Sequence, residues 1–175
     1  RKALLERLVR DAGSFGRMIF EKDIIQKNVK KLNICAYKTS GFCCTIDSLE
    51  SYFLANMELL NTAVREDLFC SERPVYTKVR DDMPVIYGLG SDVKNSLIAD
   101  GCIIDGTVEN CILFRGVRIG KDTVVKNSIL MQGTYISDGV NLNCVITDKS
   151  AVITPNKVLS GAENYPMFIG KNIVI

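Results

Sequence analysis

The pattern of apolar and polar positions becomes regular in the second half of the chain. Four segments there share one motif, in which asparagine is followed by serine or cysteine and then by two apolar residues. The asparagines are Asn95, Asn110, Asn127 and Asn143, with spacings of 15, 17 and 16 residues. A second marker keeps spacings of 15, 17 and 17 residues, and consists of Ile104, Ile119, Ile136 and Ile153. Two independent markers with one period predict a repeat structure.

A period of about 16 residues is typical of a solenoid. It is too short for a helix pair or a propeller blade, but it accommodates three short strands joined by tight corners. Finer spacing agrees, because Leu113, Ile119, Val125 and Met131 are each six residues apart. An antiparallel sandwich is the competing fold, but it would not give a doubly marked period. We therefore predict a parallel β-helix of hexapeptide repeats over residues 88–175, with four to five coils stacked about 4.8 Å apart.

The same repeat predicts which residues face inward and which form corners. Branched aliphatic residues are expected to fill the core, and stacked asparagines to bond the coils above and below. Corners require positive φ, which glycine and asparagine tolerate. The glycines that fall between the aliphatic positions are Gly101, Gly106, Gly116, Gly120, Gly133 and Gly139.

Residues 1–87 have mainly helical periodicity. We predict a second helix around Ile24–Val29, a strand over Asn33–Lys38 and a third helix over Leu49–Leu60, in which Asp47 and Glu50 form a capping box. Residues 61–87 are expected to cross over to the solenoid. These elements make a poor independent core, so we expect them to be the end of a larger α/β domain. The first predicted helix ends at Gly13, and its apolar stripe consists of Leu4, Leu5, Leu8, Val9 and Ala12.

Composition narrows the expected partners and compartment. The net charge is only +2, which gives no reason to expect nucleic acid or an anionic membrane as a partner. No run of about 18 apolar residues is present. The first residues are amphipathic, unlike a signal peptide, and lack an initiator Met, so we expect a sequence that begins inside a longer cytoplasmic protein.

Cysteine and histidine usage bears on the chemistry. Seven cysteines without CxxC spacing argue against a zinc site or a disulfide framework. We expect Cys102, Cys111 and Cys144 to be buried thiols in a reducing cytosol. Histidine is absent. This argues against an acyltransferase or a carbonic anhydrase on the same scaffold, because these enzymes use histidine as general base or zinc ligand.

The segments together resemble the C-terminal half of glucose-1-phosphate adenylyltransferases. The resemblance rests on Ala55–Leu60 (Ala-Asn-Met-Glu-Leu-Leu), Pro74–Val79, Tyr87-Gly88 and above all Gly101–Asn110. It implies an α+β fragment of a nucleotidyltransferase domain followed by a single-stranded left-handed parallel β-helix. The implied parts are residues 1–72, a linker at 73–87 and the β-helix at 88–175. Within the family, the chain looks most like the GlgD-type subunit of bacterial glycogen synthesis.

One position departs from the family pattern. Catalytic members carry Gly-Tyr-Trp-x-Asp-Val-Gly-Thr before the Ala-Asn-Met helix, and its Asp helps to hold Mg²⁺. An ungapped alignment places Gly41–Ser48 there, with Thr45 in place of that Asp. A neutral hydroxyl cannot replace a carboxylate as a hard anionic ligand. The family uses Mg²⁺ and ATP, but we predict no catalytic, cofactor-binding or metal-binding residue in this chain. Asp47 lies on the same side of an extended strand as Thr45, but its expected role is to cap the next helix.

The resemblance and this departure predict a function. We expect a non-catalytic, regulatory or assembly subunit in a hetero- or homo-oligomer with a catalytic glucose-1-phosphate adenylyltransferase subunit. The alternative is the C-terminal half of an active enzyme. Basic residues on the coils suggest an effector site, but acidic residues are interspersed, so we assign none. The basic residues are Arg115, Arg118, Lys121 and Lys126, and the acidic ones are Glu109, Asp122 and Asp138.

Overall fold

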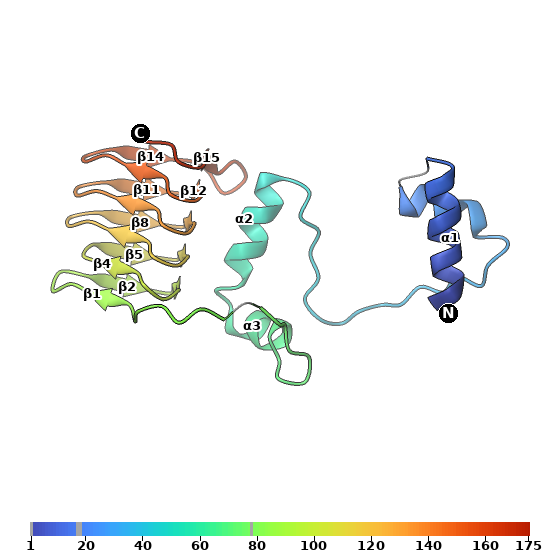
Figure 1. Cartoon of the computed structure of the whole chain (residues 1–175). Coiled ribbons are helices and arrows are strands. Elements are labelled where there is room, and N and C mark those ends of the chain that lie inside the picture. The colour runs from blue at the N-terminus through green and yellow to red at the C-terminus, as the bar shows by residue number, and fades with distance from the viewer. Residues whose placement is uncertain (1, 17–18, 78) are drawn as a thin grey trace. The chain divides into compact units, whose positions relative to one another are not determined.

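The computed structural model describes residues 2–16, 19–77 and 79–175. Lys78, part of the segment Pro74–Val79 that carries the resemblance, lies outside the described residues. The chain forms two compact units, residues 1–40 and 41–175. In the first unit, helix α1 (Lys2–Ser14) confirms the predicted N-terminal helix (Figure 1). The second predicted helix is present as η1 (Phe20–Gln26), a wider π-type helix with Ile24 buried.

The strand predicted over Asn33–Lys38 is wrong. This segment is irregular and largely exposed, and the strands assigned in the described part of the chain begin at residue 86. A strand needs a neighbour to bond its backbone N–H and C=O groups. Residues 33–38 have the alternation of a strand, but none of the described strands pairs with them, so they stay irregular.

The second unit begins with two helices, α2 (Leu49–Glu58) and α3 (Thr62–Leu68). Helix α2 confirms the third predicted helix, but its predicted cap is wrong. Ser48 is the N-cap, and its side chain accepts a hydrogen bond from the Ser51 N–H at 3.1 Å. The hydroxyl of Ser51 in turn accepts from the Ser48 N–H at 2.9 Å, which completes a capping box one residue later than predicted.

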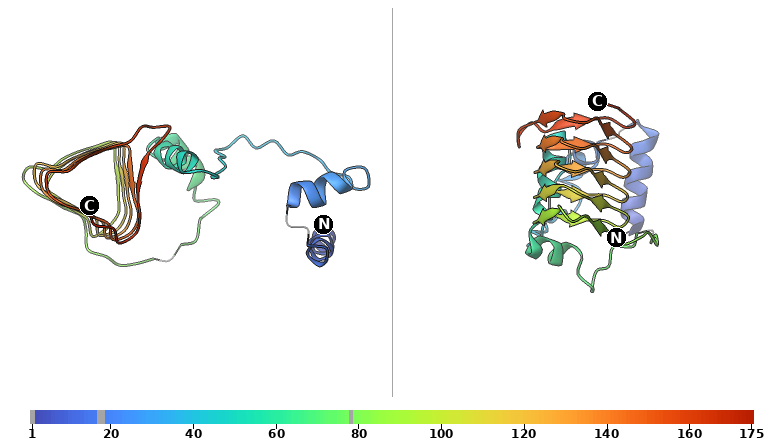
Figure 2. Two further views of the ribbon diagram at one scale, coloured as in Figure 1. Left: turned by 90° about the horizontal axis from the view of Figure 1, so that it is seen from above. Right: turned by 90° about the vertical axis from the view of Figure 1, so that its left-hand side faces the viewer.

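Residues 86–169 form three parallel sheets, each of five strands, stacked as the faces of a triangular solenoid (Figures 1 and 2). The predicted parallel β-helix is confirmed. Face A contains β1 (Ile86–Tyr87), β4 (Ile103–Ile104), β7 (Arg118–Ile119), β10 (Tyr135–Ile136) and β13 (Val152–Ile153). Face B contains β2 (Asp92–Lys94), β5 (Thr107–Glu109), β8 (Val124–Lys126), β11 (Asn141–Asn143) and β14 (Val158–Ser160). Face C contains β3 (Leu97–Ile98), β6 (Ile112–Leu113), β9 (Ile129–Leu130), β12 (Val145–Thr147) and β15 (Met167–Ile169).

The corner between faces B and C corrects one marker of the repeat. Asn95, Asn110 and Asn127 adopt positive φ values of 42°, 53° and 45°, as the corner requires. In the fourth coil the positive φ, 51°, is at Cys144, because Asn143 pairs with Lys126 in the adjacent strand. The prediction that places Asn143 in the series is therefore wrong by one residue. The corner positions 95, 110, 127 and 144 are spaced 15, 17 and 17 apart, as are the four isoleucines.

The core of the solenoid is made of the inward-facing residue of each short strand. Ile104, Ile119, Ile136 and Ile153 stack in register on face A and are at most 1% exposed. The three predicted buried thiols are confirmed, since Cys102, Cys111 and Cys144 are 0, 0 and 4% exposed. Since apolar area removed from water is the main source of folding free energy, this continuous column carries the stability of the second unit.

Candidate functional site

The loop that contains Thr45 is fixed to the helices beside it. Thr45 is exposed and lies in an irregular stretch before α2. The Phe42 N–H donates to Asp67 Oδ2 on α3 at 2.7 Å, and Gly41 lies so close that a Cβ there would be 2.7 Å from the same oxygen. Asp67 is also bonded by Arg73, whose guanidinium donates to the Asp67 carbonyl at 3.1 Å. The backbone around Thr45 is thus held at one end by α3.

The other end of this loop is held by the cap of α2. Asp47 accepts a hydrogen bond from the Ser51 hydroxyl at 3.2 Å, so its carboxylate belongs to the helix start. Thr45 itself offers a neutral hydroxyl. Among the described residues, no group of three or more His, Cys, Asp or Glu side chains is arranged to hold a metal ion. The role of Thr45 as the replacement of a metal ligand stays a prediction.

Face C carries apolar residues on its outer side as well as its inner side. The outward residues of its five strands lie in register and form what we call the outer stripe: Leu97, Ile112, Ile129, Ile146 and Phe168. Their inward neighbours are Ile98, Leu113, Leu130, Thr147 and Ile169. Outward positions of an exposed sheet are normally polar, so the outer stripe marks a surface that contacts another element.

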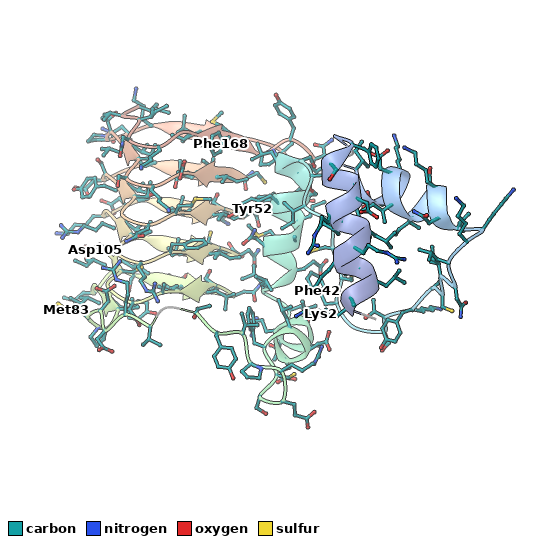
Figure 3. All side chains as sticks on the ribbon, turned by 45° about the vertical axis from the view of Figure 1, so that its right-hand side comes forward. Lys2, Phe42, Tyr52, Met83, Asp105 and Phe168 are labelled. Atoms are coloured by element: carbon teal, nitrogen blue, oxygen red, sulfur yellow. The ribbon has the colours of Figure 1, made fainter. Side chains whose placement is uncertain are left out.

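Helix α2 covers the middle of the outer stripe. Phe53 packs in one buried cluster with Ile129, Cys144 and Ile146, and is 2% exposed. Tyr52 and Met57 pack against the same cluster, and Figure 3 shows Tyr52 and Phe168 on the helix and the last strand. Burial raises the pKa of Tyr52, with a further contribution from the charge of Asp148. The ends of the stripe are less covered, since Leu97 is partly exposed and Phe168 is 51% exposed.

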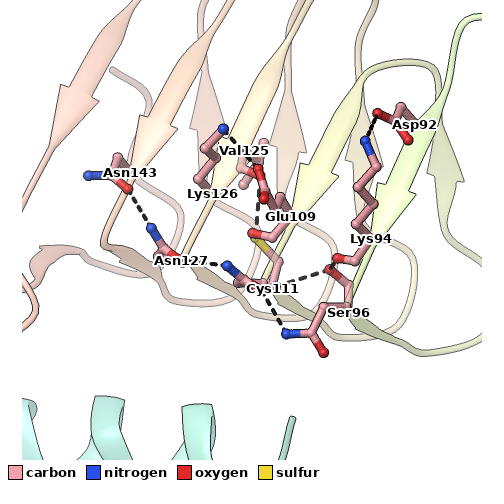
Figure 4. Close-up of polar contacts among 11 residues, drawn as sticks. Asp92, Lys94, Ser96, Glu109, Cys111, Val125, Lys126, Asn127 and Asn143 are labelled. Carbon is pink, nitrogen blue, oxygen red and sulfur yellow. Dashed lines mark hydrogen bonds and ion pairs between the residues drawn. The ribbon is translucent and has the colours of Figure 1, made fainter.

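Face B is polar on its outer side, in contrast to face C. Lys94 bonds Asp92 at 2.6 Å, and Lys126 bonds Glu109 on the neighbouring strand at 2.8 Å (Figure 4). The hydrogen bond and charge of Lys126 hold the pKa of Glu109 below its ordinary value. Paired charges at the solvent suit a face that is exposed to water.

A ladder of side-chain amides runs along the corner between faces B and C. Asn95 donates to Asn110, Asn110 to Asn127 and Asn127 to Asn143, at 2.7, 3.3 and 2.9 Å (Figure 4). The expected bonding between stacked asparagines is confirmed. Asn143 joins the ladder although Cys144 occupies its corner position. The amides of Asn95, Asn110 and Asn127 border a cleft. Phe53, Leu54 and Met57 of α2, with Leu60 just after the helix, also line it.

The basic residues named in the sequence do not converge on one point. Arg115 and Arg118 line a shallow pocket at the corner between faces C and A, together with Arg80. Lys121 lines a different pocket, beside Asp105 and Asp122, and Lys126 is paired with Glu109. These positions leave the effector site unassigned.

Sequence reasoning overlooked the outer stripe. The outer stripe is visible in the sequence as pairs of adjacent apolar residues 15–17 positions apart from Leu97-Ile98 to Val145-Ile146, followed by Phe168-Ile169 after a longer gap. The strands of face B instead place one apolar residue between polar ones in Asp92-Val93-Lys94 and Thr107-Val108-Glu109. That difference distinguishes a face covered on both sides from one that faces water.

Comparisons with known proteins give one matching family model and several relatives. Residues 87–164 match the family model described as GlmU-like, C-terminal hexapeptide. The chain is 42% identical to the glycogen biosynthesis protein GlgD of Bacillus subtilis over 153 residues, which are 87% of this chain and 45% of that protein. It is 49% identical to GlgD of Geobacillus stearothermophilus over 152 residues, 87% of this chain and 44% of that protein.

Glucose-1-phosphate adenylyltransferases match this chain at lower identity than the two GlgD proteins do. The glucose-1-phosphate adenylyltransferase of Clostridium perfringens is 35% identical over 118 residues, 67% of this chain and 30% of that enzyme. The chain thus spans less than half the length of each of these relatives. The described residues contain no helix that is both long and apolar enough to span a membrane.

Proposed function

Because this chain is homologous to GlgD proteins and to glucose-1-phosphate adenylyltransferases, we propose that it is part of a non-catalytic subunit of the adenylyltransferase. The subunit would support the synthesis of ADP-glucose from ATP and glucose 1-phosphate for glycogen biosynthesis. The observation that carries the proposal is the identity of 42 and 49% with two GlgD proteins over 87% of the chain.

Thr45 supports the non-catalytic part of the proposal. By the resemblance, this position holds a Mg²⁺-binding Asp in catalytic members. Phosphoryl transfer relies on the metal to neutralise charge that develops on the phosphates. A hydroxyl supplies no anionic ligand, and the carboxylate two residues later, that of Asp47, is bonded to Ser51. We therefore expect a chain with Thr45 to bind the metal poorly and to turn over slowly.

The proposed partner is a catalytic glucose-1-phosphate adenylyltransferase subunit, in a hetero- or homo-oligomer in the cytoplasm. The solenoid supports a contact role because it presents an apolar outer stripe that α2 covers only in its middle. Exposed apolar surface in a rigid scaffold is typical of a protein contact site.

Co-purification tests the proposed partnership. The full-length protein that contains this chain is co-expressed with the catalytic subunit of the same organism, and one subunit carries an affinity tag. We expect both to elute together, and the ADP-glucose synthesis rate of the catalytic subunit to change when the partner is present. Separate elution together with an unchanged rate would contradict the proposal.

The second candidate is the C-terminal half of an active adenylyltransferase, which the 35% identity with the Clostridium perfringens enzyme favours. It requires Asp47 to replace the missing ligand from a position two residues later. In that case Asp47→Asn would abolish turnover by the full-length protein, whereas Thr45→Ala would not. The non-catalytic proposal expects neither variant to change the rate of ADP-glucose synthesis by the full-length protein alone.

A further inference from the structure

The first coil of the solenoid supplies a terminal strand to each face, namely β1, β2 and β3. On face A, the last strand is extended by the chain end, because the Val152 N–H donates to the Ile173 carbonyl at 2.9 Å and the Ile175 N–H to the Val152 carbonyl at 3.0 Å. At the other end, β2 is the terminal strand of face B. The inward residues of the first coil, Tyr87, Val93 and Ile98, remain partly or largely exposed. Open sheet edges of this kind readily accept a further strand.

The register of the coils predicts which residues fit below β2. In every coil the inward residue of face B precedes the outward residue of face A by ten positions: Val93 and Ile103, Val108 and Arg118, Val125 and Tyr135, Leu142 and Val152. Ile86 is the outward residue of β1. Ten positions before it lies Tyr76, flanked by Val75 and Thr77. The sequence Val-Tyr-Thr has the β-branched and aromatic composition of a strand.

The backbone already follows this register for part of the way. The Gly101 N–H donates to the Met83 carbonyl at 2.6 Å, as the Gly116 N–H does to the Asp100 carbonyl one coil later at 3.1 Å. Before Met83 the chain leaves the stack. Residues 75–77 are assigned to no strand, and the side chains of Tyr76 and Val75 are 92 and 55% exposed.

We propose that Val75–Thr77 can add to the free edge of β2 as a further parallel strand, with the Tyr76 ring over Val93 at the open end of the core. We call this segment the strap. When it is added, the exposed ring of Tyr76 becomes buried and the backbone of β2 gains hydrogen-bond partners. The site is the β2 edge, and its occupant is a segment of the same chain.

The sequence also explains why the strap is not a permanent coil. Ile98 lies five residues after Val93, and the residue five after Tyr76 is Asp81. A carboxylate at an inward position of face C cannot be buried without a partner. The strap therefore adds only its face B strand and remains in exchange with the solvent.

A pair of engineered cysteines tests the proposal in the 175-residue chain, with Cys35, Cys43, Cys44 and Cys70 changed to serine. Val75→Cys and Asp92→Cys would face outward from directly opposite positions, at a separation that suits a disulfide. We expect mild oxidation with diamide to form an intramolecular bond, read by mass spectrometry without reduction. The matched pair is Tyr76→Cys with Asp92→Cys, in which one thiol faces the core; we expect at least tenfold less bond.

Equal yields from the two pairs, no bond in either, or a bond between two chains in the first pair would each overturn the proposal. A second measurement, of hydrogen exchange, uses the chain with all its native cysteines. Hydrogen exchange of the β2 amides is expected to be faster in Tyr76→Ala than in Val79→Ala, whose side chain is 82% exposed. The same exchange rate in both variants would also contradict the strap. Neither test depends on glycogen metabolism, so a failure of the strap is distinguishable from a failure of the proposed function.

Discussion

At Gly106 the backbone of the next coil passes so close that a side chain has no room. A Cβ there would lie 2.5 Å from the Thr123 carbonyl oxygen and 2.8 Å from that of Gly120. Gly116 differs, because a Cβ there meets no atom within 4 Å but φ is +69°. One glycine is required by close packing and the other by backbone conformation. Both were predicted as corner residues, but only coordinates reveal the two different reasons.

These reasons predict different costs for alanine. Gly106→Ala forces the backbone of two coils apart, so we expect the free energy of unfolding to fall by about 3 kcal/mol. Gly116→Ala adds only the left-handed strain of an L-residue, about 1 kcal/mol. Urea denaturation followed by circular dichroism measures both. Equal losses would mean that the coil spacing adjusts at Gly106.

The cysteines give a second prediction at the scale of residues. Burial is the main cause that raises the pKa of Cys111 from 9.0 to about 12. Above pH 9 an unfolded Cys111 thiol loses its proton, whereas the folded thiol keeps it. The contribution of the buried, neutral thiol to the free energy of unfolding is therefore complete below pH 9 and is lost as the pH rises toward 12. At pH 8 we expect iodoacetamide to modify the exposed Cys35, Cys43 and Cys44 first, with Cys111 modified only on unfolding. Early modification of Cys111, read by peptide mass spectrometry, would contradict its burial.

At the scale of elements, α2 and the outer stripe form the contact that joins the helices to the solenoid. The helix ends are well satisfied: Arg65 on α3 donates to the carbonyls of Leu59 and Leu60 at 2.7 and 2.8 Å. The helix start depends on Ser48 and Ser51. On face C, α2 packs through the deeply buried Phe53, with Tyr52 and Met57 against the same cluster.

Adjacent residues of α2 separate the contact from the helix itself. Phe53→Ala removes the side chain that is 2% exposed, and we expect a loss of about 4 kcal/mol in the free energy of unfolding. Leu54→Ala, at a side chain that is 46% exposed, should cost less than about 1 kcal/mol. Hydrogen exchange should also show α2 amides opening before those of the solenoid in Phe53→Ala. Similar losses in both variants would mean that α2 does not dock through Phe53.

The cap of α2 offers a further test of the element. Ser48→Ala removes the acceptor of the Ser51 N–H and should cost about 1 kcal/mol. Asp47→Ala loses only a bond to the Ser51 hydroxyl, so we expect less than half that cost. Thermal unfolding curves of the two variants compare them directly. A larger effect at Asp47 would restore the cap that the sequence first indicated.

The sequence predicts those elements best that repeat. The isoleucine marker held in all four coils because each one fills the same core position. The asparagine marker failed at Asn143. There the motif begins one residue before the corner, and the residue with positive φ is Cys144. Helix α3 was missed because its seven residues are too few for a clear periodic pattern. The strand at residues 33–38 failed because pairing is a tertiary property.

At the scale of the whole molecule, the loop around Thr45 belongs to the same compact unit as the solenoid. Asp67 holds its start, the cap of α2 holds its end and Phe53 joins α2 to face C. The division proposed from the sequence, at residues 73–87, separates a nucleotidyltransferase-like part from the β-helix. The two compact units are residues 1–40 and 41–175. The division at residues 73–87 stays a prediction. Helix α2 can derive from the nucleotidyltransferase-like part and still lie in one compact unit with the solenoid, because it packs on face C.

In the subunit that we propose, Thr45 takes the place of a metal ligand and the solenoid is retained. The most direct measurement is the rate at which the purified full-length protein, without any catalytic subunit, converts ATP and glucose 1-phosphate to ADP-glucose in the presence of Mg²⁺. We expect a rate at least a thousandfold below that of the catalytic subunit assayed in the same way, since removal of the metal site removes most of the transition-state stabilisation. A rate within about tenfold of the catalytic subunit would contradict the non-catalytic role.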